Sequence, residues 1–169
     1  MKTETAVNNN KVLLRRYEDD LNVGGLGVIV LGAWSVVKAI MQLFTMIKSS
    51  ALELEADDEL TQTLGVILFT VIFLLILLLI MQVHLYVGLN AMKAARGQKH
   101  KRGYVVWAVI ALALQFLSYI SYGNMFKDIA NIDTTLASLL VDITMTYTFF
   151  IVVRSAHRIK KLKASEAGE

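Results

Sequence analysis

The chain has 169 residues, of which 56% are hydrophobic and 18% are charged, with a net charge of +3 and a mean hydropathy of +0.55. Soluble domains average about 45–50% apolar residues, so this excess is typical of a membrane protein, and the length fits one domain. The sequence contains no cysteine, which excludes disulfides, thiolate metal sites and cysteine nucleophiles, and no proline, which favours continuous helices.

Four apolar segments follow one another along the chain, each about as long as a membrane-spanning helix. They cover residues 23–47, 64–89, 104–122 and 136–153. A spanning helix needs about 20 mainly apolar residues to cross a hydrocarbon core of about 30 Å. The second segment has no charged residue at all. We therefore predict an all-α, polytopic membrane protein, a single domain built as an up-down-up-down bundle of four transmembrane helices.

The charges between these segments alternate in sign. The N-terminal segment, the loop after the second apolar segment and the C-terminal tail are rich in lysine and arginine. The other two loops have one basic residue each, Lys48 and Lys127, among several aspartates and glutamates. The positive-inside rule then predicts that both termini and the middle loop are cytoplasmic, in a plasma membrane of the bacterial inner-membrane type. The basic segments are expected to attract anionic lipid headgroups rather than nucleic acid.

The segment before the first span, residues 8–22, carries both apolar and charged residues. It does not resemble a cleavable signal peptide, because the apolar run that follows is too long and no A-x-A-like site comes after it. Val12, Leu13 and Tyr17 favour an amphipathic helix on the inner membrane surface, with Arg15 and Arg16 near the headgroups. A flexible polar tail is the equally weighted alternative.

Two opposite charges lie inside the predicted spans, Lys38 in the first and Asp142 in the fourth. Lys38 precedes Lys48 by ten positions and Asp142 follows Thr134 by eight, which places them roughly 15 Å and 12 Å below the outer boundary. Charges that face lipid cost about 2.5–3.5 kcal/mol each on insertion scales. We therefore expect the two side chains to turn inward and to approach each other.

Other polar residues share a helix face with these charges. They are Trp34, Gln42 and Thr45 on the first helix, Thr135, Ser138 and Thr146 on the fourth, and Gln115, Ser118, Tyr119 and Tyr122 on the third. Residues three, four, seven or eight positions apart lie on one face of an α-helix. We expect Gln42, Gln115 and Tyr119 to be hydrogen-bonding neighbours of the charged pair. The resulting candidate site contains Lys38, Gln42, Gln115, Tyr119, Ser138 and Asp142.

Two functions are compatible with this candidate site. Intramembrane ionisable groups commonly mark transport pathways, so the pair indicates a proton, ion or small-solute site. Four helices enclose little space, and transport would therefore require a homo-oligomer or a membrane partner protein. Alternatively, the pair sets the helix register, and the chain is a non-transporting interaction or regulatory subunit. For the Lys38–Asp142 pair itself, a structural role and a role as a transport site have equal weight. For the protein as a whole, ion or solute handling is the leading hypothesis.

His84 is the one histidine inside a predicted span, and it is a candidate titrating group. A packed histidine is the favoured reading, because no second His, Glu or Cys lies at ligand spacing nearby. We predict no metal site and no cofactor. Motifs of hydrolases, zinc proteases, P-loops and dinucleotide-binding folds are absent from the sequence, so we predict that the chain is not an enzyme.

Four glycines cluster at the start of the first span, at positions 24, 25, 27 and 32. Their spacing does not form a G-x-x-x-G dimer motif. We expect them to permit close approach to a neighbouring helix.

Overall fold

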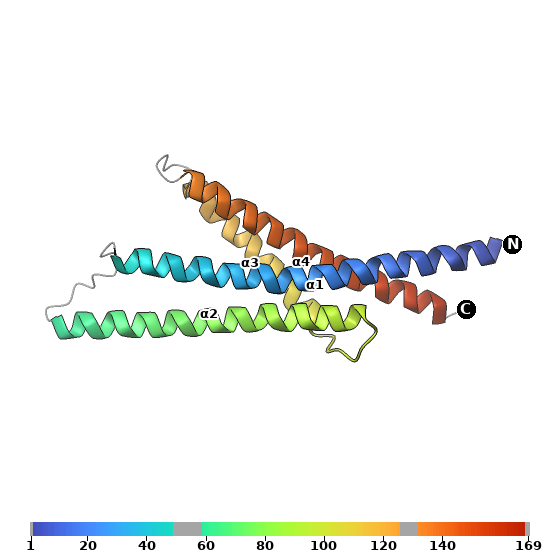
Figure 1. Ribbon diagram of the computed structural model, residues 1–169, viewed down its shortest axis with the longest axis horizontal. Helices are drawn as coiled ribbons and strands as arrows, with labels where there is room; N and C mark the ends of the chain where they lie inside the picture. The colour runs from blue at the N-terminus through green and yellow to red at the C-terminus, as the bar shows by residue number, and fades with distance from the viewer. Residues whose placement is uncertain (1, 49–58, 126–131, 168–169) are drawn as a thin grey trace.

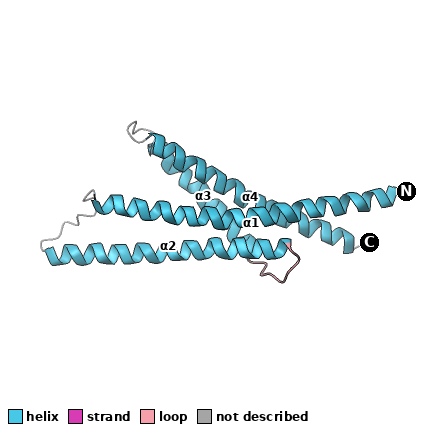
Figure 2. Cartoon of the chain, in the orientation of Figure 1, coloured by secondary structure: helices cyan, strands magenta, loops and turns pink. Residues whose placement is uncertain are grey.

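The computed structural model describes residues 2–48, 59–125 and 132–167, all of them helical apart from one turn (Figure 2). The helices are α1 (Lys2–Lys48), α2 (Glu59–Ala95), α3 (Tyr104–Met125) and α4 (Ile132–Ala167). The predicted all-α architecture with four helices is confirmed. Three helices are long and apolar enough to cross a membrane, within Asn9–Met41, Thr63–Ala95 and Ser138–Ser165. The apolar stretch of α3, Tyr104–Ile120, is shorter.

The helices form two antiparallel hairpins, α1–α2 and α3–α4, and both chain termini lie at the same end of the molecule (Figure 1). We refer to this as the terminal end and to the opposite one as the far end. α1 contacts α2 and α4, whereas α3 contacts mainly α4 and, among the described residues, does not contact α1. Towards the far end the α3–α4 hairpin diverges from α1 and α2 (Figure 1). α4 therefore joins the two hairpins.

α1 is one uninterrupted helix from Lys2 to Lys48. The segment before the first predicted span is thus neither a separate surface helix nor an irregular tail, but the first turns of α1. Its apolar side packs where α1 meets α4: Leu21 and Ile159 are buried in one cluster, which Leu14 and Tyr17 flank. The Nζ atom of Lys163 lies 3.2 Å from Oε1 of Glu18 in the same region. The predicted C-terminal tail is likewise a continuation of α4.

Glycines let α1 approach both of its neighbours. A Cβ atom at Gly25 would lie 2.8 Å from the carbonyl oxygen of Gly88 on α2, and one at Gly27 would lie 2.9 Å from Cγ2 of Thr148 on α4. Real Cβ atoms essentially never come so close to another heavy atom. The expectation that these glycines permit close helix packing is confirmed, and it holds on two faces of α1 at once.

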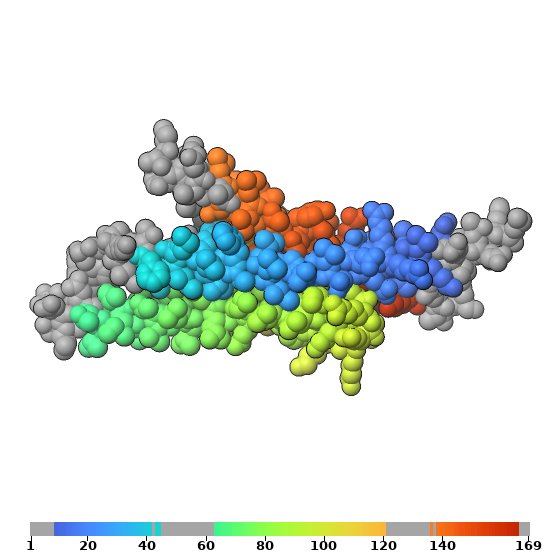
Figure 3. Space-filling view, in the orientation of Figure 1, coloured from blue at the N-terminus to red at the C-terminus, as the bar shows by residue number. Residues whose placement is uncertain are grey.

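The turn between α2 and α3 has a defined backbone. Gly97 has a φ of +67°, a conformation that other residues rarely adopt. Its N–H donates to the carbonyl of Ala94 (3.1 Å), and the N–H of Gln98 donates to that of Lys93 (2.9 Å), a Schellman motif that ends α2. The Oδ1 atom of Asn90 accepts a hydrogen bond from the N–H of Lys101 (3.1 Å). The side chains of this turn project from the body of the molecule in the space-filling view (Figure 3).

The buried core lies nearer the terminal end. Its members come from all four helices and include Val28, Val87, Ala108, Phe149 and Val152. At the far end the side chains of α2 are mostly exposed. The predicted charged pair on α1 and α4 therefore lies on the far side of the main core, where the two hairpins begin to separate.

Candidate functional site

Lys38 and Asp142 are in contact. Nζ of Lys38 lies 3.4 Å from Oδ2 of Asp142, within range of a hydrogen bond and a salt bridge between the two hairpins. The Lys38 side chain is 25% exposed and that of Asp142 is 13% exposed. The pair is thus largely enclosed by protein, with the lysine on the more open side.

A chain of hydroxyl groups connects α3 to the backbone beside Asp142. Oγ1 of Thr146 donates to the carbonyl oxygen of Asp142, one turn earlier (2.9 Å). Because a threonine hydroxyl has a single hydrogen, the hydroxyl of Tyr119 is the donor in its 2.6 Å contact with Thr146 Oγ1. The chain reaches the backbone carbonyl of Asp142. It therefore ties α3 to α4 one turn away from the Lys38–Asp142 pair.

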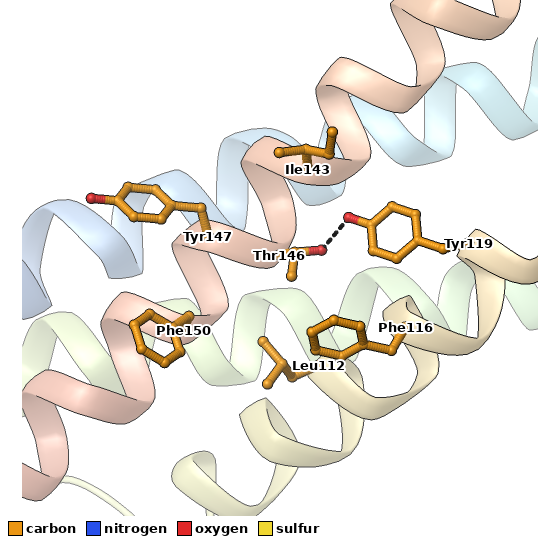
Figure 4. Close-up of a pocket in the computed structure, with 7 residues that line it drawn as sticks. All are labelled: Leu112, Phe116, Tyr119, Ile143, Thr146, Tyr147 and Phe150. Carbon is orange, nitrogen blue, oxygen red and sulfur yellow. Dashed lines mark hydrogen bonds between the residues drawn. The ribbon is translucent and has the colours of Figure 1, made fainter. Parts of the chain in front are cut away.

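A groove of about 380 Å³ opens between α3 and α4 next to this hydroxyl chain. Its lining residues are Leu112, Phe116, Tyr119, Ile143, Thr146, Tyr147 and Phe150. In Figure 4 the aromatic rings of Phe116 and Phe150 border the groove, and the Tyr119–Thr146 hydrogen bond closes one side of it. Neither Lys38 nor Asp142 lines the groove. Its apolar walls suit hydrocarbon chains and offer no charged group to an ion.

The remaining predicted site residues have separate positions. The side chain of Gln42 lies outside the described residues. Gln115 is half-buried on α3, and its backbone carbonyl accepts a hydrogen bond from the Ser118 hydroxyl (2.7 Å). Ser138 is half-buried on α4, one turn before Asp142. Among the described residues, the side chains of Gln115 and Ser138 make no hydrogen bond to the charged pair.

His84 of α2 packs against α1 and α4. Its side chain is buried, its Nδ1–H donates to the carbonyl of Ile80 (2.8 Å), and its ring centroid lies 5.6 Å from that of Phe149. Gly32 provides the space, because a Cβ there would lie 2.6 Å from the Cγ atom of His84. Nε2 is buried without a hydrogen-bond partner in the described part of the chain. This geometry fits the favoured interpretation of His84 as a packing residue.

Thr146 was not among the predicted site residues, although it carries the link between α3 and α4. The sequence placed it on the polar face of the fourth helix, one turn after Asp142. That spacing alone could have identified its bond to the Asp142 carbonyl, because a threonine in a helix often bonds the carbonyl four residues earlier. The approach of Tyr119 could not have been found in this way, since it depends on how α3 packs.

Within the described residues, no group of three His, Cys, Asp or Glu side chains lies close enough together to hold a metal ion. No protein-family model, curated protein or solved structure matches the chain. What the protein does has to be inferred from its own residues.

Replacing Tyr119 by phenylalanine removes the hydroxyl donor to Thr146 and leaves the ring in place. We expect the free energy of unfolding in mixed micelles to fall by about 0.6–1.7 kcal/mol, the range measured for hydrogen bonds between membrane helices. Tyr147→Phe is the matched control, because Tyr147 lines the same groove but is 63% exposed. An equal fall in the free energy of unfolding for the two variants would show that the Tyr119 hydrogen bond does not hold α3 to α4.

Proposed function

We propose that this chain is a non-transporting interaction or regulatory subunit that crosses a plasma membrane four times, with both termini in the cytoplasm. The basic residues of the terminal segments and of the turn after α2 support this orientation, because such residues are retained on the cytoplasmic side. α3 then serves as the shortest span, and the terminal end is the cytoplasmic one. The lipid bilayer, with anionic headgroups at its inner face, surrounds the protein.

The observation that carries this proposal is the pairing of Lys38 with Asp142. The two charges lie 3.4 Å apart and are largely enclosed, and the groove between α3 and α4 is apolar and is lined by neither of them. A solute site needs polar groups that face a cavity. A pair that binds one hairpin to the other is better explained as a brace, which fixes the arrangement of helices at a depth where unpaired charges are costly.

The brace acts on two helices that continue into the cytoplasm. α1 and α4 pack closely where Gly27 meets Thr148, the Lys38–Asp142 pair lies on the far side of this contact, and Glu18 meets Lys163 on the terminal side. At 1.5 Å per residue, the 47 residues of α1 extend about 70 Å, more than twice a hydrocarbon core of about 30 Å. The surplus is a helical pair outside the bilayer, which is available to a partner protein.

The exposed surface of this cytoplasmic pair is strongly charged. Lys11, Arg15 and Arg16 of α1 and Arg158 and Lys161 of α4 are all exposed. Basic side chains near a membrane surface bind anionic headgroups and acidic partner surfaces. The position of the brace thus sets how α1 and α4 present these groups.

A second candidate function is the handling of a proton, an ion or a small solute at the Lys38–Asp142 pair. The specific observation in its favour is that Lys38 keeps a quarter of its side chain exposed although it lies within a predicted span. A partly exposed lysine beside a carboxylate is a group that an ion or a proton can reach. The two functions differ in what happens when both charges are removed together.

Lys38→Met and Asp142→Leu separate the two functions. Each single substitution leaves one charge without its counterion, and we expect a loss of about 1–3 kcal/mol in the free energy of unfolding, less than for a fully buried pair because both groups are partly exposed. The double variant should regain wild-type stability to within about 1 kcal/mol. Lys11→Met, which removes an exposed lysine from α1, should not change the free energy of unfolding.

Proteoliposomes report on transport with the same variants. The brace predicts that the wild type and the double variant carry no more proton or cation flux than protein-free vesicles. Flux through the wild type that the double variant lacks, although it is folded, would contradict the brace and establish the transport hypothesis.

The interaction itself can be tested by a photo-crosslinking amino acid at Arg158 in native membranes. We expect a discrete adduct with one membrane or cytoplasmic protein, whose yield falls at least threefold in Asp142→Leu and recovers when Lys38→Met is added. The same crosslinker at Ile120, an exposed apolar residue of α3, is the control and should give mainly lipid adducts. An Arg158 adduct pattern no different from that at Ile120 would contradict an interaction through the cytoplasmic helices.

A further inference from the structure

One face of α2 is left uncovered by the described residues 2–48, 96–125 and 132–167. The opposite face carries His84 and Gly88, which pack against Gly32 and Gly25 of α1. Successive residues of an α-helix are rotated by about 100°, so Gln82 points about 160° away from His84. Gln82 is exposed.

The residues that share this face with Gln82 follow a heptad pattern. Leu68, Leu75 and Leu89 are separated from it by multiples of seven, and Val71 and Leu78 lie between them at the alternate spacing of three and four. These five apolar residues are between 44% and 62% exposed. Apolar residues repeated in this way form the contact seam of helices that pair in parallel.

Gln82 is the polar residue in the middle of this seam. It lies seven residues inside the inner end of the predicted span, about 10 Å deep, and eleven residues from Lys93, about 16 Å. Its amide makes no hydrogen bond to any part of the chain that the structure describes. Asn90, two turns later, differs in this respect: its Nδ2 donates to the carbonyl of Tyr86 (2.8 Å), and its Oδ1 accepts from Lys101.

An unpaired amide in hydrocarbon costs several kcal/mol, and lipid tails cannot satisfy it. The group that covers Gln82 must therefore bring both a donor and an acceptor to this depth. The glutamine amide of a second copy does so. All copies in one membrane have the same orientation, so a two-fold axis along the membrane normal places equal depths of two α2 helices, and thus two Gln82 side chains, opposite each other.

We propose that the chain forms a parallel homodimer through this face of α2, with Leu68, Leu75 and Leu89 packed against their counterparts and paired Gln82 amides at the centre. A single polar residue at such a position fixes the register of the paired helices and the number of helices that associate. The interface lies on the side of α2 away from α1. It is therefore independent of the Lys38–Asp142 brace and of the function proposed for it.

Disulfide crosslinking in native membranes tests the proposed interface, because the chain has no natural cysteine. Leu75→Cys places a thiol on the seam, and we expect most of this variant to oxidise to a dimer. Ile76→Cys is the matched control: it is at nearly the same depth and is 52% exposed, but it points about 120° away from Gln82. Equal oxidation of the two variants, dimerisation of neither, or crosslinking of Leu75→Cys to a different protein would overturn the proposal.

Gln82→Leu tests the role of the amide. Energy transfer between labelled copies in vesicles should show self-association weakened about three- to tenfold, in line with the strength of hydrogen bonds between membrane helices. Gln82→Asn keeps an amide, and its self-association should be weakened less than that of Gln82→Leu. The unfolding free energy of the monomer in micelles should not fall in either variant, because Gln82 has no described partner within the chain. Self-association of Gln82→Leu as tight as that of the wild type would also overturn the proposal.

Discussion

The ion pair between Lys38 and Asp142 connects two hairpins that otherwise diverge. On the terminal side of this pair, α1 and α4 are held by close packing at Gly27 and Thr148. Beyond it, the α3–α4 hairpin separates from α1 and α2 (Figure 1). In the proposed topology both charges lie within hydrocarbon, where neither is stable without the other. In the proposed brace their attraction sets how far the hairpins open, and α1 and α4 extend that geometry to the terminal end.

The other polar groups of the spans are arranged around this constraint. Tyr119 donates a hydrogen bond to Thr146, which donates to the Asp142 carbonyl, and this chain attaches α3 to α4. His84 fills the space that Gly32 leaves between α1 and α2. Each of these groups is used inside one protomer. Gln82 on α2 differs from them, because in the proposed dimer its amide pairs with that of the second copy. Two copies would then carry two pairs of cytoplasmic helices, presented side by side to a partner.

The sequence was sufficient to predict the features that depend on the periodicity of apolar residues and on the cost of placing a charge in hydrocarbon. The four helices, the contact of Lys38 with Asp142 and the close packing at the glycines of α1 follow from these two sources. The continuity of α1 from Lys2 could not be predicted in the same way. Its first turns are polar, and they are helical because Leu21 and its neighbours pack against α4, a tertiary contact that no local pattern records.

The same limit applies to the candidate site. Helical spacing correctly placed Thr146 on the face of Asp142, but which neighbour reaches that face depends on the order in which helices pack. α4 lies between α1 and α3, and Tyr119 of α3 reaches α4 at Thr146. Gln115 and Ser138 share a face with site residues without bonding to them, because a shared face fixes direction and not distance.

The central claim, that the Lys38–Asp142 pair fixes the crossing of α1 and α4, is tested most directly by the distance between spin labels at the terminal ends of these two helices. Lys11→Cys and Ala164→Cys provide two exposed label sites in a chain without natural cysteines. The account predicts a broader, shifted distance distribution in Asp142→Leu and a return to the wild-type distribution when Lys38→Met is added. A distribution that Asp142→Leu leaves unchanged, or that the second substitution does not restore, would contradict it.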